Sequence, residues 1–459
     1  MKAGRKHSVN LIVEKKNQNN YVWSKSIDVV KDKTINLQKI KTKKEWNMIF
    51  FVSDKANSLK DWVDSTIDYL EVIDKPNNIN LFIIKGQYWR KYNDDSEIVD
   101  SWETNKGYYV TNYENIEIVD YGDQNFGDAD FYRNEIQKIK EKYPSEHTYV
   151  SIFSHGSGWD ESGIEMSESV PNTNPFIGAL SADHSKKYEN QRGIHDAIDT
   201  KELYAIFEGI EVDFLDINAC SMGTVEVLND LPNSIKYVST SPSTTYANIS
   251  SLEGFMEDVS NGITNLERLG KNHVDRAIES FEYQDEGTTK TLYNMKYSRD
   301  LPKKMKSLTD ALYNNLNNNP ENITKFAKEV IYSNDKVQTY WKNETRKSQN
   351  DSKDLVGIID YLINNKNSYG DEVYNAAQEV KTVLDNYIAY HRYTEGQENK
   401  PAGPAITGDV DMSNMNYKKS KGLTIYVGKF SSFSYKETWF NEEAQWYRII
   451  DLMPRYEEL

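Results

Sequence analysis

Short apolar runs alternate with amphipathic helical patterns through the middle of this chain. The strand-sized runs lie at residues 46–53, 80–85, 116–120, 149–154, 212–218 and 235–239. The helical patterns lie at residues 58–72, 128–142, 199–207 and 223–231. Alternation of this kind is typical of a mostly parallel sheet with helices on both faces. The pattern therefore predicts an α/β fold.

The two ends of the chain have a different pattern. Residues 1–40 are lysine-rich and weakly alternating, which indicates an N-terminal extension with a strand or two. Beyond residue 252 the pattern is chiefly helical, and we expect a late apolar run at 423–427 to return to the sheet. We therefore expect an extension at 1–40, a central α/β unit at 41–251 and a helical C-terminal subdomain at 252–459.

Composition narrows the classes of protein that the chain can represent. It has 459 residues, 38% of them hydrophobic, which is enough for a substantial core. The net charge of -16 argues against nucleic-acid binding, and no apolar run approaches the roughly 18 residues of a membrane span. The first residues are too polar for a signal peptide. We therefore expect a cytoplasmic protein, unless a leader has been removed from the chain.

Two of the apolar runs end in reactive dipeptides. Residues 149–154 lead into His155-Gly156, and residues 212–218 lead into Ala219-Cys220, which contains the only cysteine of the chain. Ligands gather beyond the carboxyl ends of strands in such sheets, so the pair suggests a thiol nucleophile with an acid/base partner. The backbone N–H groups of Gly156 and Cys220 are the candidate oxyanion donors. Taken alone, Cys220 would more simply be an inert core residue.

These motifs carry a resemblance to a known family. Residues 154–159 read SHGSGW and residues 218–227 read NACSMGTVEV, while weaker matches lie at 46–59 and 421–426. Together they resemble the clostripain family of cysteine peptidases, in the caspase-like clan, over roughly residues 46–453. The resemblance implies a caspase-like α/β/α sandwich, endopeptidase activity and a dyad of His155 and Cys220.

The substrate pocket departs from the family pattern. Family members typically cut after Arg or Lys and use an acidic residue two positions before the cysteine, where this chain has Asn218. Asp216 lies deeper on the same strand face and either substitutes for that carboxylate or serves a structural role. Thr240 and Ser241 begin a second candidate wall, where the family usually has a Ser-Glu pair. We therefore expect a polar, uncharged pocket and weakened basic specificity.

The long segment between the two motifs predicts a surface loop. Family members are often matured by cleavage there, and this loop carries Lys186, Lys187 and Arg192, which are either processing sites or ordinary solvated charges. A monomer or a self-processed two-chain form is expected. The resemblance also implies export if a leader was removed.

No cofactor is required for this chemistry. Calcium enters only through the resemblance, because neither acidic stretch of the chain has the spacing of a calcium loop, and the seven histidines do not form a zinc pattern. The leading hypothesis is a cysteine endopeptidase that acts on protein or peptide substrates. The alternatives are a peptide-binding or scaffolding module of the same fold, and a peptide ligase that uses the same thioester.

Overall fold

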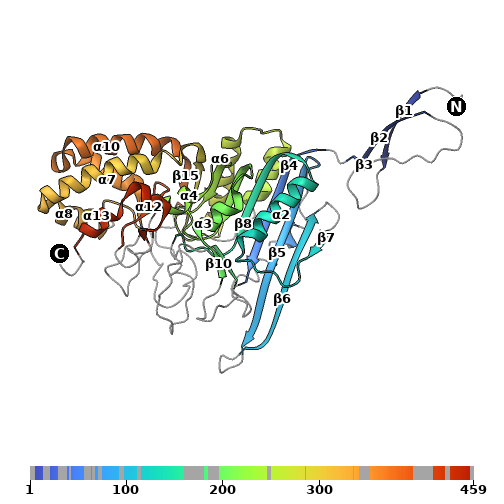
Figure 1. The fold of residues 1–459 in the computed structure, drawn as a ribbon, viewed down its shortest axis with the longest axis horizontal. Helices are drawn as coiled ribbons and strands as arrows, with labels where there is room; N and C mark the ends of the chain where they lie inside the picture. Colours follow the sequence, from blue (N-terminus) through green and yellow to red (C-terminus); the bar gives the residue numbers. More distant parts are fainter. Residues whose placement is uncertain are drawn as a thin grey trace.

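The computed structural model describes residues 6–13, 21–28, 39–40, 43–55, 64, 68–70, 75–92, 98–110, 115–159, 180–183, 196–245, 250–284, 286–333, 335–340, 352–395, 417–428 and 435–454. A nine-stranded sheet runs through the middle of the molecule, and helices α7, α8, α10 and α13 gather at one end (Figure 1). At the other end, the three-stranded sheet of β1, β2 and β3 is set apart from the body (Figure 1).

The order of strands in the large sheet is β15-β13-β12-β11-β8-β4-β5-β6-β7. The five central strands β12, β11, β8, β4 and β5 are mutually parallel, whereas β13, β15, β6 and β7 pair antiparallel with their neighbours. The nine strands are β4 (Lys44–Asp54), β5 (Ile79–Tyr92), β6 (Ile98–Val110), β7 (Asn115–Asp120), β8 (Ser145–Phe153), β11 (Val212–Asn218), β12 (Ile235–Thr240), β13 (Thr289–Asn294) and β15 (Ile388–Tyr393). This mixed sheet with helices is the expected α/β architecture.

Smaller sheets and the helices complete the fold. The other strands are β1 (Lys6–Val13), β2 (Tyr21–Asp28), β3 (Lys39–Ile40), β9 (Leu180–Asp183), β10 (Asp196–Ile198), β14 (Ser352–Asp354) and β16 (Thr424–Tyr426). The α-helices are α2 (Ala129–Lys142), α3 (Thr200–Phe207), α4 (Val225–Asp230), α5 (Ser250–Ser260), α6 (Leu266–Tyr283), α7 (Leu301–Asn318), α8 (Pro320–Phe326), α9 (Leu355–Asn364), α10 (Lys366–Tyr387), α12 (Trp439–Ala444) and α13 (Tyr447–Leu452). A 3-10 helix, η3 (Met295–Tyr297), follows β13, and a π-helix, η4 (Ala327–Ile331), follows α8. Among the described helices, none is both long and apolar enough to cross a bilayer.

Alternating side chains of each central strand fill two separate cores. Ile49 and Phe51 of β4 pack with residues of α2 and α3 on one face of the sheet. Met48 and Phe50 pack with residues of α5 and α6 on the other face. Burial on both faces explains why these strands read as nearly continuous apolar runs in the sequence.

The C-terminal part contributes differently from the expectation. The late apolar run does form β16, but β16 pairs antiparallel with β14 in a separate two-stranded sheet, so the predicted return to the central sheet is wrong. The pairing differs because β16 lies beside the loop beyond the carboxyl end of β11, where the Thr424 N–H donates to the Gly223 carbonyl at 3.1 Å. Instead, β13 and β15 bring this half of the chain into the central sheet. The proposed domain boundaries stay a prediction.

A buried carboxyl group fastens β16 to helix α4. Glu226 is fully buried, and Tyr426 N–H donates to its Oε1 at 3.0 Å. Burial raises the pKa of Glu226 from 4.5 to about 7, although the hydrogen bond from the Tyr426 N–H opposes that change. A carboxyl group with a raised pKa in the folded state contributes stability at low pH, and that contribution is lost as the pH rises towards 7.

This linkage predicts that Glu226→Gln stabilises the protein at pH 8 and not at pH 5. At pH 8 the substitution removes a buried negative charge, which we expect to raise the free energy of unfolding by roughly 1–3 kcal/mol. Urea unfolding at both pH values measures the difference. The exposed Glu208 provides the control, since Glu208→Gln should change little at either pH. Equal effects of Glu226→Gln at pH 5 and pH 8 would contradict the linkage.

Candidate active site

Strand register brings His155 and Cys220 side by side. Strands β8 and β11 are parallel neighbours, and Phe153 of β8 pairs with Asn218 of β11. His155 and Cys220 each follow their paired residue by two positions, beyond the same edge of the sheet. Ser154 N–H donates to the Asn218 carbonyl at 3.4 Å, so the two chains still run together past the last paired residues. The dyad residues therefore share one end of the sheet despite their separation in sequence.

The loops that follow the two strands pack tightly against each other. A Cβ atom on Gly156 would lie 2.7 Å from the Cys220 carbonyl oxygen and 2.9 Å from Ala219 Cβ, so a side chain at 156 would force the loops apart. Gly158 adopts a φ of +78°, which glycine adopts without strain. Ser221 adopts a φ of +60°, which is uncommon for a residue with a side chain. Its N–H is held by the Ser243 carbonyl at 2.9 Å, and this bond supports the turn that follows Cys220.

Burial shifts the pKa values of both candidate dyad residues towards their neutral forms. Burial raises the pKa of the Cys220 thiol, although the Thr245 N–H, 3.4 Å from Sγ, partly opposes that rise. Burial also lowers the pKa of the His155 imidazole. Both changes disfavour a thiolate-imidazolium pair. The helix that follows Cys220, α4, spans only six residues and begins at Val225.

Hydroxyl side chains line the segment after β12. Ser241 and Ser243 are fully buried, and each lies within 3.1 Å of the Thr289 hydroxyl of β13. Thr240 is also fully buried, and its hydroxyl has no hydrogen-bond partner among the described residues. The segment ends at Thr245, whose N–H and carbonyl both contact the Cys220 sulfur. Thr240 and Ser241, predicted as pocket residues, thus belong to the segment that contacts the nucleophile.

Asp216 is occupied by an internal ion pair. Its Oδ1 lies 2.8 Å from Lys290 Nζ and 3.2 Å from His273 Nε2. Burial alone would raise the pKa of Asp216, but the charges of Lys290 and His273 hold it well below its usual value. This carboxylate is therefore already neutralised from within the protein, which favours the structural role over the substitute role.

Asn218 lies one pleat above Asp216 on β11. Its side chain is uncharged, and the residue is 4% exposed. The position where the family usually has a carboxylate is therefore uncharged here. The role of Asn218 in a substrate pocket stays a prediction.

The remaining candidates are the basic residues of the predicted processing loop, the other histidines and a metal site. Lys186, Lys187 and Arg192 lie outside the described residues. The ring nitrogens of His391 lie 2.8 Å from Thr291 Oγ1 and 2.8 Å from Ser420 Oγ, so it is a structural hydrogen-bonding residue. Within the described ranges, no three His, Cys, Asp or Glu residues gather as a metal site. Calcium dependence stays a prediction.

The sequence analysis also missed residues that now define the site. Lys290 escaped attention because the polar run of β13 did not read as a strand, and His273 was assigned only to a helix. Thr245 was part of the predicted wall, without a role. The sequence carried only a partial signal for these three residues. Hydroxyl and charged residues cluster in the segments that contain them, and the structure shows that these segments are buried.

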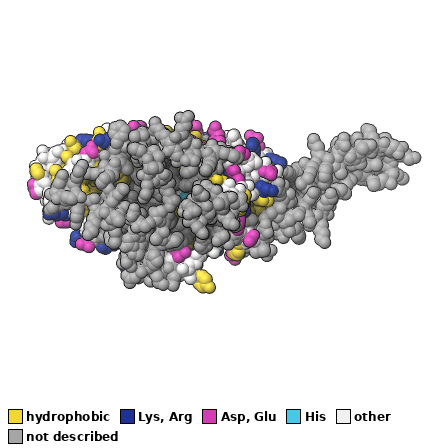
Figure 2. Space-filling view, turned by 90° about the horizontal axis from the view of Figure 1, so that it is seen from below, with side chains coloured by type: hydrophobic (Ala, Val, Ile, Leu, Met, Phe, Trp, Pro, Cys, Tyr) yellow, Lys and Arg dark blue, Asp and Glu magenta, His cyan; other side chains and the backbone are white. Residues whose placement is uncertain are grey.

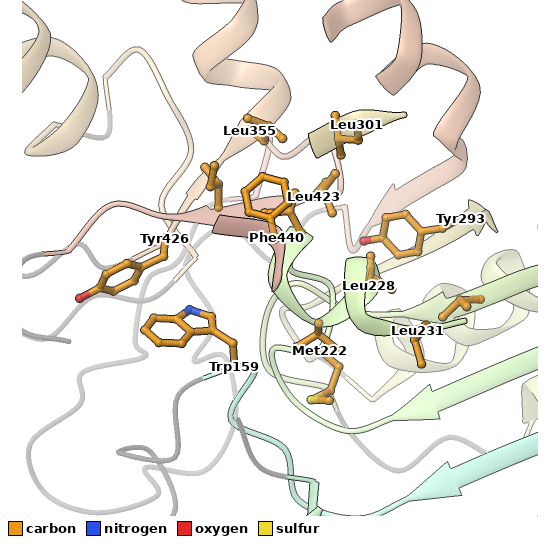
Figure 3. Packing of buried hydrophobic residues seen from close by; sticks show 14 of the residues in the cluster. Trp159, Met222, Leu228, Leu231, Tyr293, Leu301, Leu355, Leu423, Tyr426 and Phe440 are labelled. Atoms are coloured by element: carbon orange, nitrogen blue, oxygen red, sulfur yellow. The ribbon is translucent and has the colours of Figure 1, made fainter. Parts of the chain in front are cut away.

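Figure 2 turns the molecule by 90° about the horizontal axis, and a small area of histidine surface is visible near the centre of this view (Figure 2). Behind the loops, Trp159 and Met222 lie in one apolar cluster with Tyr426 (Figure 3). The Trp159 and Tyr426 rings are 4.7 Å apart, so the C-terminal segment supports the loop that follows His155.

Comparisons with known proteins give one family. The model of the clostripain family matches residues 54–452. An inactive zymogen C11 protease from Parabacteroides distasonis superposes with a TM-score of 0.60 at 18% identity, covering 88% of this chain and 99% of that one. A secreted C11 cysteine protease from Bacteroides thetaiotaomicron, in complex with an irreversible peptide inhibitor, gives 0.57 at 15% identity with the same coverage. No curated protein sequence matches the chain.

The neutral dyad predicts a slow, strongly pH-dependent thiol. Because the pKa of Cys220 is raised, less thiolate is present at pH 7 than in an ordinary cysteine, and alkylation should accelerate up to a midpoint above that of a free thiol. Iodoacetamide labelling followed by intact mass reports this residue alone, since the chain has one cysteine. The urea-unfolded chain is the control for the ordinary midpoint. A labelling rate that is already constant below pH 7 would contradict the neutral dyad.

Proposed function

Because the chain belongs to the clostripain family of cysteine peptidases, whose model matches residues 54–452, we propose that it is a cysteine endopeptidase acting through Cys220 and His155. The observation that carries the proposal is the pairing of Phe153 with Asn218, which puts the thiol and the imidazole at the same end of adjacent strands. A nucleophile beside a base is the arrangement that thiol acyl transfer requires.

The chemistry then follows from the positions of these groups. The Cys220 sulfur attacks the peptide carbonyl, and His155 takes the thiol proton and passes it to the leaving amine. The N–H groups of Gly156 and Cys220 stabilise the oxyanion, an effect worth about 10²–10³ in rate for one donor. Water, activated by His155, then hydrolyses the thioester. The close contact of the two loops at Gly156 supports the oxyanion assignment, because it leaves room at that position only for a residue without a side chain.

The resting geometry favours a precursor form that needs activation. A raised thiol pKa and a lowered imidazole pKa are unfavourable for attack, and both result from burial. One structural relative is described as an inactive zymogen, and we propose that cleavage between the two motifs activates this chain as well. With a neutral pocket, self-cleavage after Lys186, Lys187 or Arg192 is disfavoured, so we propose that another peptidase performs it. By analogy with the secreted relative, we place the protein outside the cytoplasm.

The function is tested with a diverse peptide library and mass spectrometry of the products. We expect the wild-type chain to cut peptides after limited proteolysis of the interdyad loop and much more slowly before it, and Cys220→Ala to reduce cutting by at least about 10³-fold. Assays with and without calcium measure the dependence that the family resemblance implies. Thermal unfolding confirms that the variant is folded. Unchanged cutting by Cys220→Ala would contradict the peptidase, and binding without turnover would favour a peptide-binding module.

The pocket assignment predicts the effect of restoring the missing carboxylate. Asn218→Asp changes almost no volume but adds a charge that can bond a basic side chain, which is worth about 1.5–3 kcal/mol. We expect kcat/KM for peptides with Lys or Arg before the cut bond to rise roughly tenfold. Peptides with Gln at that position serve as the internal control and should not gain. An unchanged ratio of the two peptides would place the pocket elsewhere.

A further inference from the structure

The first residues of β13 are polar and yet fully enclosed. Thr289 and Lys290 begin the strand, Thr288 directly precedes it, and all three are between 0% and 3% exposed. A lysine is almost never buried unless it is paired. The burial of these three polar residues therefore requires specific partners.

Their contacts lead directly to the nucleophile. The Thr289 hydroxyl lies 3.0 Å from Ser241 Oγ, and the Thr288 hydroxyl donates to the Thr244 carbonyl. The next residue, Thr245, contacts the Cys220 sulfur through its N–H and its carbonyl. The start of β13 thus underlies the wall that touches Cys220, which ties Lys290 to the candidate pocket.

Lys290 also contacts a buried carboxylate of β11. Its Nζ donates to Asp216 Oδ1 at 2.8 Å, reaching across the intervening strand β12. His273 Nε2 lies 3.2 Å from the same oxygen, and His273 Nδ1 lies 3.2 Å from the Ser251 carbonyl. Asp216 and Asn218 share one face of β11, so this buried cluster lies directly below the uncharged position.

We infer that Lys290 is a specificity-determining residue: it compensates Asp216 from within, so that the site takes peptides with an uncharged side chain before the cut bond and disfavours Lys or Arg there. The inference rests on the proposed peptidase function. A basic substrate side chain would meet a carboxylate whose charge is already satisfied, and a second cation beneath it. An uncharged polar side chain instead meets an amide and hydroxyl groups.

The distance makes this effect measurable. Two residues along a strand separate Asp216 from Asn218 by about 7 Å. One uncompensated charge at that distance in a partly buried site changes binding of an ion by roughly ten- to fiftyfold. Removing either partner of the ion pair should therefore change the substrate preference, and the direction depends on which charge remains.

Two substitutions of opposite sign test the inference. Lys290→Met removes the nearer cation and leaves Asp216 with only its His273 contact, and we expect the kcat/KM ratio of Lys-containing to Gln-containing peptides to rise at least tenfold. Asp216→Asn leaves Lys290 positive, and we expect that ratio to fall, with Glu-containing peptides gaining. Lys290→Arg keeps the cation and should keep the wild-type preference. The double variant Lys290→Met/Asp216→Asn removes both charges and should not gain basic cleavage.

The outcomes separate this inference from the proposed function. If all variants cut in a Cys220-dependent way with the wild-type preference, the peptidase stands and the inference fails. If the wild-type chain itself prefers Lys or Arg, the inference also fails. If no chain cuts any peptide after loop proteolysis, the proposed function fails and the inference with it. Should Lys290→Met not fold, the opposite change in Asp216→Asn decides, because a purely structural ion pair predicts no gain for Glu-containing peptides.

Discussion

The parallel pairing of β8 with β11 is the constraint on which the site depends. One residue of slip between these strands would send every side chain of one strand to the opposite face and separate His155 from Cys220. The register is held by burial on both faces, since β11 is enclosed along its whole length. The chemistry of the dyad therefore follows from packing in the middle of the sheet, and not from the loops alone.

A second constraint is the support behind the loops. The rings of Trp159 and Tyr435 lie 5.2 Å apart, and those of Tyr426 and Tyr435 lie 5.0 Å apart, so the loop after His155 rests on C-terminal residues. Thr424 holds the loop after Cys220 from the same segment. The C-terminal half is thus part of the active-site scaffold, which explains why the family match extends to residue 452.

Much of this architecture could be predicted from the sequence. The apolar runs before His155 and Cys220 gave the correct adjacent strands, because burial on both faces leaves a strong signal. The run of β13 gave none, since Thr289 and Lys290 are buried through hydrogen bonds and an ion pair with residues distant in sequence. The return of the run at 423–427 was predicted incorrectly, because strand propensity does not determine the pairing partner. Partners of buried charges depend on tertiary contacts, which periodicity does not encode.

Electrostatics adds the property that distinguishes this site. The thiol and imidazole are neutral at rest, and the nearest buried carboxylate on β11 is neutralised by Lys290. Such a site exerts little attraction on a basic side chain, despite the acidic character of the whole chain. Net charge therefore acts on the approach of a substrate from solution, whereas the buried ion pair acts on which side chain the proposed pocket binds.

The central claim is that strand register makes His155 the proton partner of Cys220 towards a peptide. The most direct measurement is the rate of covalent labelling by a peptide electrophile with Gln at its reactive end, followed by peptide mapping. The account predicts one adduct, on Cys220, formed at least about a hundredfold more slowly in His155→Ala and unchanged in His147→Ala, at the far end of the same strand. An adduct that forms equally fast in His155→Ala would contradict the account.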